Sequence, residues 1–231
     1  GGHAVTDTLP MNFREKTLEA WVKLDNLKQR AGGVVTIQSP TGTIFDSIVY
    51  AEKNPNNWMA GSNGFRRTQS FAGAPPEENA DKEFVHLAIT YQPDGTVTGY
   101  RKGRPYGKAY KTGKASFPKN NSVLSFGVRH LPASPQRVLH GRIREVRVYN
   151  RVLEADAVMA SFGGISDYVS QKELLAVLAP ERRKDRDELL KKIAELEKKL
   201  ESLGDIDSNA KTGLQDLALA IFNMKEFIYL K

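Results

Sequence analysis

A short segment of the chain, residues 57–69, combines aromatic and polar side chains. Its sequence, NWMAGSNGFRRTQ, holds two aromatic residues and four that form hydrogen bonds, namely Trp58, Phe65, Asn63, Arg66, Arg67 and Gln69. An aromatic ring can stack on the apolar face of a sugar while amides and guanidinium groups bind its hydroxyls. The segment therefore predicts a sugar-binding surface. The alternative is that both aromatic rings lie in the core and the arginines are only solvated.

Two further side chains are expected to face the same rim. Arg129 and His130 end a candidate strand just before the Pro-rich loop 131–137. With them, the candidate ligand-binding set is Trp58, Asn63, Phe65, Arg66, Arg67, Gln69, Arg129 and His130.

The sequence offers no arrangement typical of an enzyme active site. Nucleophilic catalysis by serine needs a positioned histidine, and none of the four histidines, His3, His86, His130 and His140, follows a nucleophile-elbow pattern. His86 lies in the apolar run VHLAITY, which predicts a packed histidine with its hydrogen bonds satisfied. The chain has no cysteine, which excludes disulfides, thiolate metal sites and covalently attached haem within it. We expect no catalytic residue.

The charge is unevenly distributed along the chain. The whole sequence carries a formal net charge of +7, and residues 165–231, with 12 basic and 13 acidic side chains, leave +8 on residues 1–164. A basic surface favours anionic partners such as acidic glycans, nucleic acid or lipid headgroups, although excess lysine can also be merely solvated. No apolar run approaches the roughly 18 residues that a membrane span needs.

Short strands dominate the first part of the chain. Alternating or apolar runs separated by turn residues predict strands at 17–24, 33–38, 43–50, 57–60, 65–71, 84–91, 96–101, 122–129 and 141–149. Many short strands with regular breaks indicate a β-sandwich. Pro93-Asp94-Gly95 predicts a tight turn between the strands at 84–91 and 96–101. A short helix is expected over 154–161.

The pattern changes after Gly163-Gly164. Pro180 is expected to lie in the first turn of a helix, and Leu189, Ile193, Leu196, Leu200 and Leu203 form a short coiled-coil seam. A second helix is expected from about residue 208, with an apolar stripe from Leu214 to Ile228. We predict an antiparallel helical hairpin over 165–231, after a sandwich over 1–164. The alternative is that the seam forms a homodimer or docks other domains.

Three stretches resemble a known family. TLEAWVKL near the start, GRIREVRVYNRVL near residue 150 and the hairpin FVHLAITYQPDGTVTGYRKGRPYG resemble the laminin-G-like, concanavalin A-like jelly roll, over roughly residues 10–164. In the hairpin, Lys102 stands where the family usually has Asn. The resemblance implies a mainly β jelly-roll sandwich that binds carbohydrate.

The same family suggests two chemical features that this chain lacks. Its glycosidases use a Glu-x-Asp-x-x-Glu strand; here Glu154 and Asp156 have the first spacing, but Met159 replaces the third acid. A frequent calcium ligand, an Asp of the last strand, is replaced by Arg144. We therefore expect no metal and no cofactor, with Arg144 bridging the groups that the ion would join. If the alignment slips by one residue, Glu145 is the ligand instead.

The last segment, DLALAIFNMKEFIYLK, resembles the C-terminus of large cytochrome-associated multidomain proteins of Planctomycete bacteria. This implies a module of a larger extracytoplasmic (periplasmic or secreted) protein. The expected function is non-catalytic, lectin-like binding of a glycan, without nucleic acid or membrane as partner. The basic charge of residues 1–164 favours an anionic polysaccharide as that glycan. The alternative is a structural module that clamps neighbouring domains of the parent protein. The sequence does not predict the oligomeric state.

Overall fold

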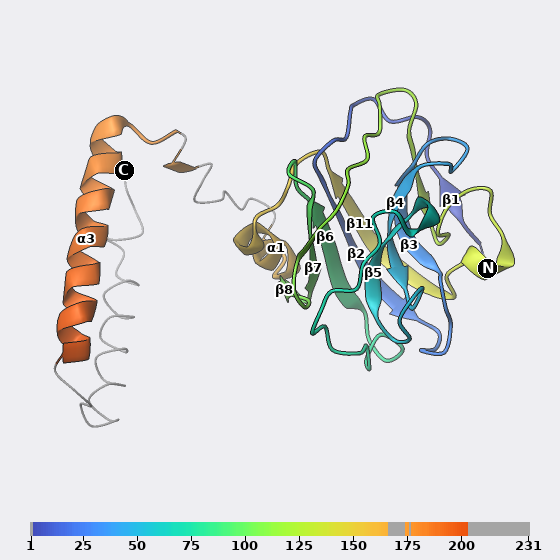
Figure 1. Ribbon diagram of the computed structural model, residues 1–231, viewed down its shortest axis with the longest axis horizontal. Coiled ribbons are helices and arrows are strands. Elements are labelled where there is room, and N and C mark those ends of the chain that lie inside the picture. The colour runs from blue at the N-terminus through green and yellow to red at the C-terminus, as the bar shows by residue number, and fades with distance from the viewer. Residues whose placement is uncertain (1, 166–173, 176, 203–231) are drawn as a thin grey trace. The chain divides into compact units, whose positions relative to one another are not determined.

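The computed structural model describes residues 2–165, 174–175 and 177–202 (Figure 1). The chain divides into two compact units, Gly1–Ser170 and Gln171–Lys231. The first unit contains every strand described below together with one helix, and the second contains a long helix.

The first unit is a sandwich of two antiparallel sheets, seen as two layers in Figure 1. One sheet has the strand order β1-β10-β3-β4-β5. Its strands are β1 (Ala4–Val5), β10 (Val123–Phe126), β3 (Gly33–Gln38), β4 (Phe45–Tyr50) and β5 (Trp58–Ser62).

The second sheet has the order β11-β2-β6-β7-β8, and β9 also pairs with β7. Its strands are β11 (Gly141–Tyr149), β2 (Lys16–Leu24), β6 (Val85–Tyr91), β7 (Thr96–Arg101), β8 (Arg104–Pro105) and β9 (Tyr110–Lys111). The first and last long strands of the sandwich, β2 and β11, are therefore neighbours.

The core lies between the sheets, and the alternation of β2 shows how the sequence builds it. Leu18, Ala20, Val22 and Leu24 are all within the core, because alternate residues of a strand point to the same face. Trp21, on the opposite face, is also buried. The helix α1 (Ala155–Phe162) covers that face, since Ser161 Oγ donates a hydrogen bond to Glu19 Oε2 at 3.0 Å.

The outer face of the other sheet is covered by the loop that follows β10. Thr36 Oγ1 donates a hydrogen bond to the carbonyl of Arg129 at 2.8 Å, and the amide of Leu131 donates to Gln38 Oε1 at 3.0 Å. Every residue of β3, β4 and β5 is consequently buried. Any ligand site of this sheet must lie at its ends and loops.

The predicted hairpin is confirmed as β6 and β7, which pair antiparallel. The next turn places Lys102 at φ +51° and Gly103 at φ +77°. Both lie in the left-handed region, where Asn and Gly are the favoured residues. Lys102, which stands where the family usually has Asn, therefore occupies a position at which the backbone of a lysine is strained.

One predicted strand is wrong. Residues 65–71 do not form a strand; a 3₁₀ turn, Asn63–Phe65, is followed by irregular chain. Gly64 and Phe65 both have positive φ, +56° and +55°, and the Arg67 amide donates to Ser62 Oγ at 2.9 Å. A compact turn thus replaces the extended chain that the residue types favoured.

The second unit contains α3 (Pro180–Ser202), which begins at Pro180 as predicted. Along it, Leu189, Ile193, Leu196 and Leu200 are exposed by 42–61%. The predicted second helix, and with it the hairpin, lies outside the described residues. In the part of the chain that the structure describes, none of the helices combines the length and apolar character that crossing a bilayer requires.

Candidate functional site

The turn between β4 and β5, residues 51–57, is the centre of the candidate site. On one side, Glu52 forms an ion pair with Arg129, which follows β10. The Glu52 side chain is 3% exposed and that of Arg129 is 18% exposed. Burial raises the pKa of Glu52, and Arg129 acts in the opposite direction. Arg129 is thus anchored to the turn, and its side chain remains partly exposed.

The next residue of the turn, Lys53, contacts an exposed aromatic ring. Its ammonium lies 5.5 Å from the centre of the Phe65 ring, within the range of a cation–π interaction. Phe65 is 48% exposed, because the left-handed conformation of Gly64 and Phe65 turns the chain outward. Arg66 follows it and is also exposed. The exposed ring thus has one cation over it, and a second cation follows it in the chain.

On the other side of the turn lies a groove with a cavity of about 150 Å³. Asn54 Nδ2 donates to Ser70 Oγ at 2.9 Å, and Asn57 Nδ2 donates to Tyr106 Oη at 3.0 Å. The groove is lined by Asn54, Asn57, Trp58, Met59, Ser70, Phe71, Ala72, Gly73 and Ala74. It is smaller than the roughly 300 Å³ at which pockets for drug-sized ligands begin. It therefore suits a small part of a ligand.

Trp58 is a core residue. The prediction that its ring is exposed for stacking on a sugar is therefore wrong. The side chain is 2% exposed, and its Nε1 donates to Glu77 Oε2 at 2.7 Å. Its ring also lies 4.8 Å from that of Tyr50. Trp58 contributes to the wall of the groove but offers no face for stacking on a sugar.

Arg67 is also internal, so it is neither the hydroxyl-binding group that we expected nor the solvated arginine of the alternative. It is 8% exposed. Its Nε donates to Asp46 Oδ1 at 2.9 Å, and its Nη2 donates to Phe45 O and to Asn63 Oδ1 at 2.8 and 3.0 Å. Arg67 therefore holds the segment against β4, and Asn63 uses its oxygen in the same network.

The remaining predicted residues stay at or near the surface. His130 is partly exposed; its ring stacks on that of Phe45 at 4.5 Å, and its Nδ1 lies 2.8 Å from Leu131 O. Burial lowers the pKa of His130, so the imidazole is neutral at physiological pH. Gln69 is exposed, with its Nε2 3.4 Å from Lys111 O.

Shared neighbours connect most of the predicted residues. Arg129 contacts Glu52, and the adjacent Lys53 contacts Phe65. The carbonyl of Phe45 accepts a hydrogen bond from Arg67, and the Phe45 ring stacks on His130. The sequence segments 57–69 and 129–130 are thus brought to β4 and its following turn.

Reasoning from the sequence missed the groove. The stretch Asn54-Pro55-Asn56 is typical of a turn between strands, and the structure adds that Asn54 and Asn57 line a groove beside that turn. Nothing local linked Ser70 to Asn54, because that contact depends on how the two loops fold. The clustering of amide side chains around Pro55 was the available signal.

Two predicted structural roles lie outside this site. His86 is fully buried, with Nε2 2.7 Å from Glu19 Oε1 and Nδ1 accepting from the Gly103 amide at 3.2 Å. This confirms a packed, satisfied histidine. Arg144 lies at a β-bulge between Ile143 and Glu145.

The Arg144 guanidinium lies 5.3 Å from the centre of the Phe84 ring, in place of the expected bridge between oxygens. Among the residues that the structure describes, no three His, Cys, Asp or Glu side chains gather as a metal site would require.

A comparison with known protein families gives a match to the sandwich. The family model described as "Concanavalin A-like lectin/glucanases superfamily", of the laminin G type, matches residues 1–159. No curated protein matches the chain in sequence.

Solved structures resemble the sandwich at low identity. A putative carbohydrate binding protein from Bacteroides ovatus is 18% identical, with a TM-score of 0.50 over 69% of this chain and 44% of that one. The SAP-like pentraxin from Limulus polyphemus is 15% identical, with a TM-score of 0.49 over 69% and 75%. Domain 4 of the arabinanase AbnA from Geobacillus stearothermophilus is 18% identical, with a TM-score of 0.45 over 69% and 80%. The first of these likenesses, with a TM-score of 0.50, is a likeness of fold alone.

Proposed function

This chain belongs to the concanavalin A-like lectin/glucanases superfamily, and on this basis we propose that it is a non-catalytic, carbohydrate-binding module. The observation that carries the proposal is Phe65, a large apolar ring held outward by a left-handed turn. The Lys53 ammonium lies over it, and Arg66 follows it in the chain. Such a ring can stack on a sugar while nearby donors bind its hydroxyls. Gln69, Arg129 and the amide nitrogen of Asn63 are the donors that we assign.

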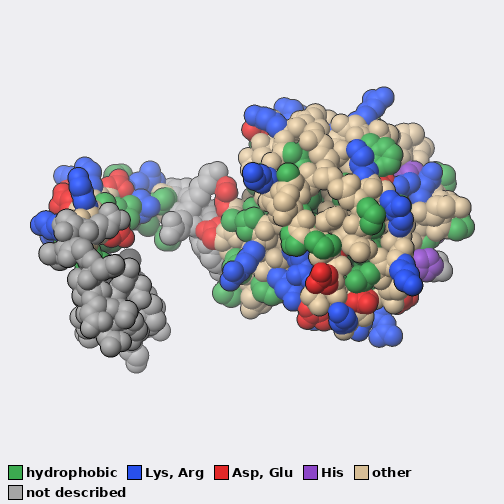
Figure 2. Space-filling view, turned by 60° about the horizontal axis from the view of Figure 1, so that its bottom comes forward, with side chains coloured by type: hydrophobic (Ala, Val, Ile, Leu, Met, Phe, Trp, Pro, Cys, Tyr) green, Lys and Arg blue, Asp and Glu red, His purple; other side chains and the backbone are tan. Residues whose placement is uncertain are grey.

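We further propose that the glycan is anionic. Residues 1–164 carry a net charge of +8, and Figure 2 shows Lys and Arg side chains spread around one face of the sandwich, with a group of Asp and Glu at its lower edge. A positive field attracts uronate or sulfate groups and weakens as salt screens it. We place the module in a larger extracytoplasmic protein, with the sandwich ending near residue 164.

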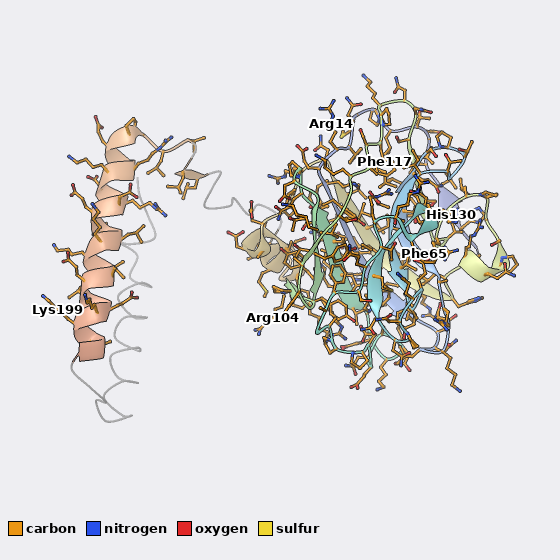
Figure 3. All side chains as sticks on the ribbon, viewed as in Figure 1. Arg14, Phe65, Arg104, Phe117, His130 and Lys199 are labelled. Atoms are coloured by element: carbon orange, nitrogen blue, oxygen red, sulfur yellow. The ribbon has the colours of Figure 1, made fainter. Side chains whose placement is uncertain are left out.

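Affinity electrophoresis through gels that contain a polysaccharide tests this proposal. We expect uronate-bearing or sulfated polysaccharides to retard the chain, and added salt to relieve the retardation. Phe65→Ala and Arg66→Ala each weaken the affinity by about tenfold or more, the scale of a central contact residue. Arg104→Ala is the matched control, because Arg104 is exposed and lies away from Phe65 and His130 in Figure 3. Retardation that is equal in all variants would contradict the assigned surface.

A second function is favoured by α3, whose seam of Leu189, Ile193, Leu196 and Leu200 is exposed. Such a stripe suits a contact with another domain of the parent protein or with a second copy. In that case the whole chain acts as a structural clamp. Analytical ultracentrifugation of the wild-type chain and of the Leu196→Glu variant distinguishes the two. A dimer that the substitution abolishes indicates contact with a second copy, and a monomeric wild type leaves contact with another domain.

A further inference from the structure

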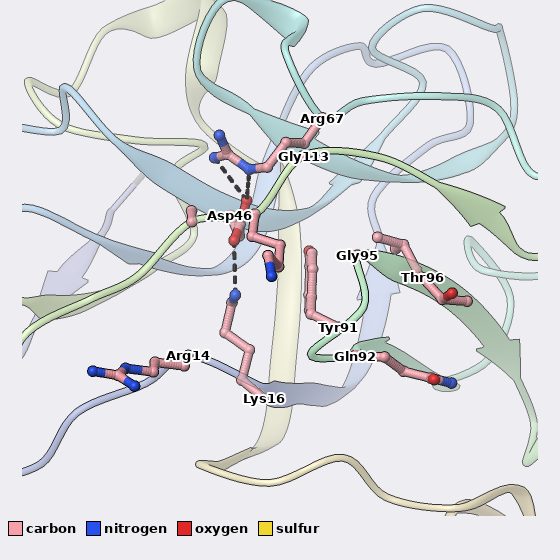
Figure 4. Close-up of a pocket in the computed structure, with 12 residues that line it drawn as sticks. Arg14, Lys16, Asp46, Arg67, Tyr91, Gln92, Gly95, Thr96 and Gly113 are labelled. Carbon is pink, nitrogen blue, oxygen red and sulfur yellow. Dashed lines mark hydrogen bonds and ion pairs between the residues drawn. The ribbon is translucent and has the colours of Figure 1, made fainter.

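A basic pocket opens beside the β6–β7 turn (Figure 4). It reaches Asp46 near the start of β4, whereas the turn at residues 51–57 follows the end of that strand. It is lined by Arg14, Lys16, Asp46, Arg67, Tyr91, Gln92, Gly95, Thr96, Val97, Gly113, Lys114 and Ala115. Four of these are basic and one is acidic. The proposed glycan surface uses neither of two buried lining residues, Lys16 and Tyr91.

The buried charges of the pocket do not balance. Lys16 is 1% exposed and its Nζ lies 2.9 Å from Asp46 Oδ2, while Arg67 Nη2 lies 2.9 Å from Asp46 Oδ1. Two buried cations therefore share one carboxylate, which leaves one positive charge in excess. Each cation has Asp46 as its partner, but the three buried charges sum to +1, and a net charge held away from water is unfavourable. An anion that contacted Lys16 would offset this excess.

Tyr91 supplies an unused hydrogen-bond donor. The residue is 7% exposed, and its hydroxyl is buried without a hydrogen-bond partner among the described residues. The Lys16 ammonium lies 4.2 Å from the centre of the Tyr91 ring. Figure 4 shows this ring beside the ion pair of Lys16 and Asp46. Burial raises the pKa of Tyr91 well above 10, and the charge of Asp46 raises it further. The hydroxyl therefore keeps its proton to donate.

We propose that this pocket binds the carboxylate of a small anionic ligand, with one oxygen held by the Lys16 ammonium and the Tyr91 hydroxyl. The enclosed space is about 10 Å³, which is room for about one water-sized atom. The second oxygen and the rest of the ligand lie in the open mouth, where Arg14 and Lys114 add positive potential. Hydrogen bonds between charged groups make such a contact strong. The proposal does not depend on the glycan surface.

Thermal unfolding of the full chain at fixed pH and ionic strength tests this pocket with three probes: acetate, glucuronate and glucose. A ligand that binds only the native state raises the unfolding temperature as its concentration rises. We expect both carboxylates to raise it and neutral glucose to leave it unchanged. A shift with glucuronate alone identifies a sugar-borne carboxylate, and a shift with acetate alone identifies a small free acid.

The variant Tyr91→Phe locates the effect. It removes only a hydroxyl without a partner, so the fold is retained, and we expect the carboxylate affinity to fall at least about tenfold. Tyr149→Phe is the matched control and keeps the affinity, because it removes the hydroxyl of a partly buried tyrosine that donates to Glu19 Oε2 at 3.2 Å, outside the pocket. No shift with either carboxylate, an equal shift with glucose, or a shift unchanged in Tyr91→Phe overturns the proposal. The glycan proposal fails separately, through Phe65 and Arg66.

Discussion

Glu77 shows how a single buried residue joins distant parts of the sandwich. Its Oε2 accepts hydrogen bonds from Trp58 Nε1 and Arg101 Nε, both at 2.7 Å, and its Oε1 accepts from Arg101 Nη2 at 2.7 Å. The amides of Asn79 and Ala80 also donate to Oε1. Burial alone raises the pKa of Glu77, but the hydrogen bonds from Arg101, Trp58 and the Asn79 amide, together with the charge of Arg101, hold the pKa below its usual 4.5.

We predict that Glu77→Gln lowers the free energy of unfolding by about 3 kcal/mol at neutral pH, because it leaves the Arg101 charge without its partner. The native pKa is depressed, so the stabilisation by this carboxylate is complete above 4.5 and is lost as the pH falls through the native pKa. The difference in free energy of unfolding between the wild type and Glu77→Gln therefore becomes smaller below pH 4.5. Urea unfolding at neutral pH and at about pH 3 measures it.

The control for Glu77 is Glu83→Gln. Glu83 is an exposed carboxylate paired with Lys102, and exposed pairs contribute about 0–1 kcal/mol. A gap between Glu77→Gln and the wild type that stays constant down to low pH would show that the carboxylate charge contributes nothing.

For single residues, the sequence indicated which side chains could bind a sugar, but it did not indicate which of them are exposed. Phe65 and Arg66 reach solvent as expected, whereas Trp58 and Arg67 of the same segment are buried. The buried ion-pair partner of Arg67 is Asp46, on β4. This ion pair could not be predicted from residues 57–69, because Asp46 lies outside that segment and the segment does not alternate as a strand would.

Among the elements, the β7–β8 turn carries strain that a substitution can relieve. Lys102 has φ +51°, which costs a non-glycine residue about 1–2 kcal/mol, and Asn tolerates this conformation better. We predict that Lys102→Asn raises the free energy of unfolding by about 0.5 kcal/mol, after the loss of an exposed ion pair worth roughly as much. Thermal and urea unfolding measure the change.

Lys111→Asn is the matched control for the turn. It also removes an exposed ion pair, with Asp94, but Lys111 is not among the residues with positive φ. A Lys102→Asn protein that is no more stable than Lys111→Asn would contradict the account of strain.

The long strands were predictable because alternation and apolar runs identify them, as at β2, β3 and β6. The two-residue strand β1 and the turn at 63–65 were not. Ala4 and Val5 pair with Ser125 and Phe126 of β10, so their extended form depends on distant residues. The turn at Gly64 and Phe65 depends on Ser62 accepting the Arg67 amide.

At the scale of the whole molecule, the sandwich has its own core between two sheets. We therefore predict that a fragment of residues 1–164 unfolds cooperatively, with a melting temperature within a few degrees of that of the same transition in the full chain. Differential scanning calorimetry measures both. A fragment without a cooperative transition would show that the sandwich needs residues beyond 164.

The most direct measurement is binding of the full chain to an array of neutral, uronate-bearing and sulfated glycans, beside the Phe65→Ala/Arg66→Ala double variant. We predict that the wild type binds a subset of anionic glycans and that the double variant loses this binding while it melts at the same temperature. No binding to any glycan by the folded wild type would contradict a lectin-like function and favour the structural clamp.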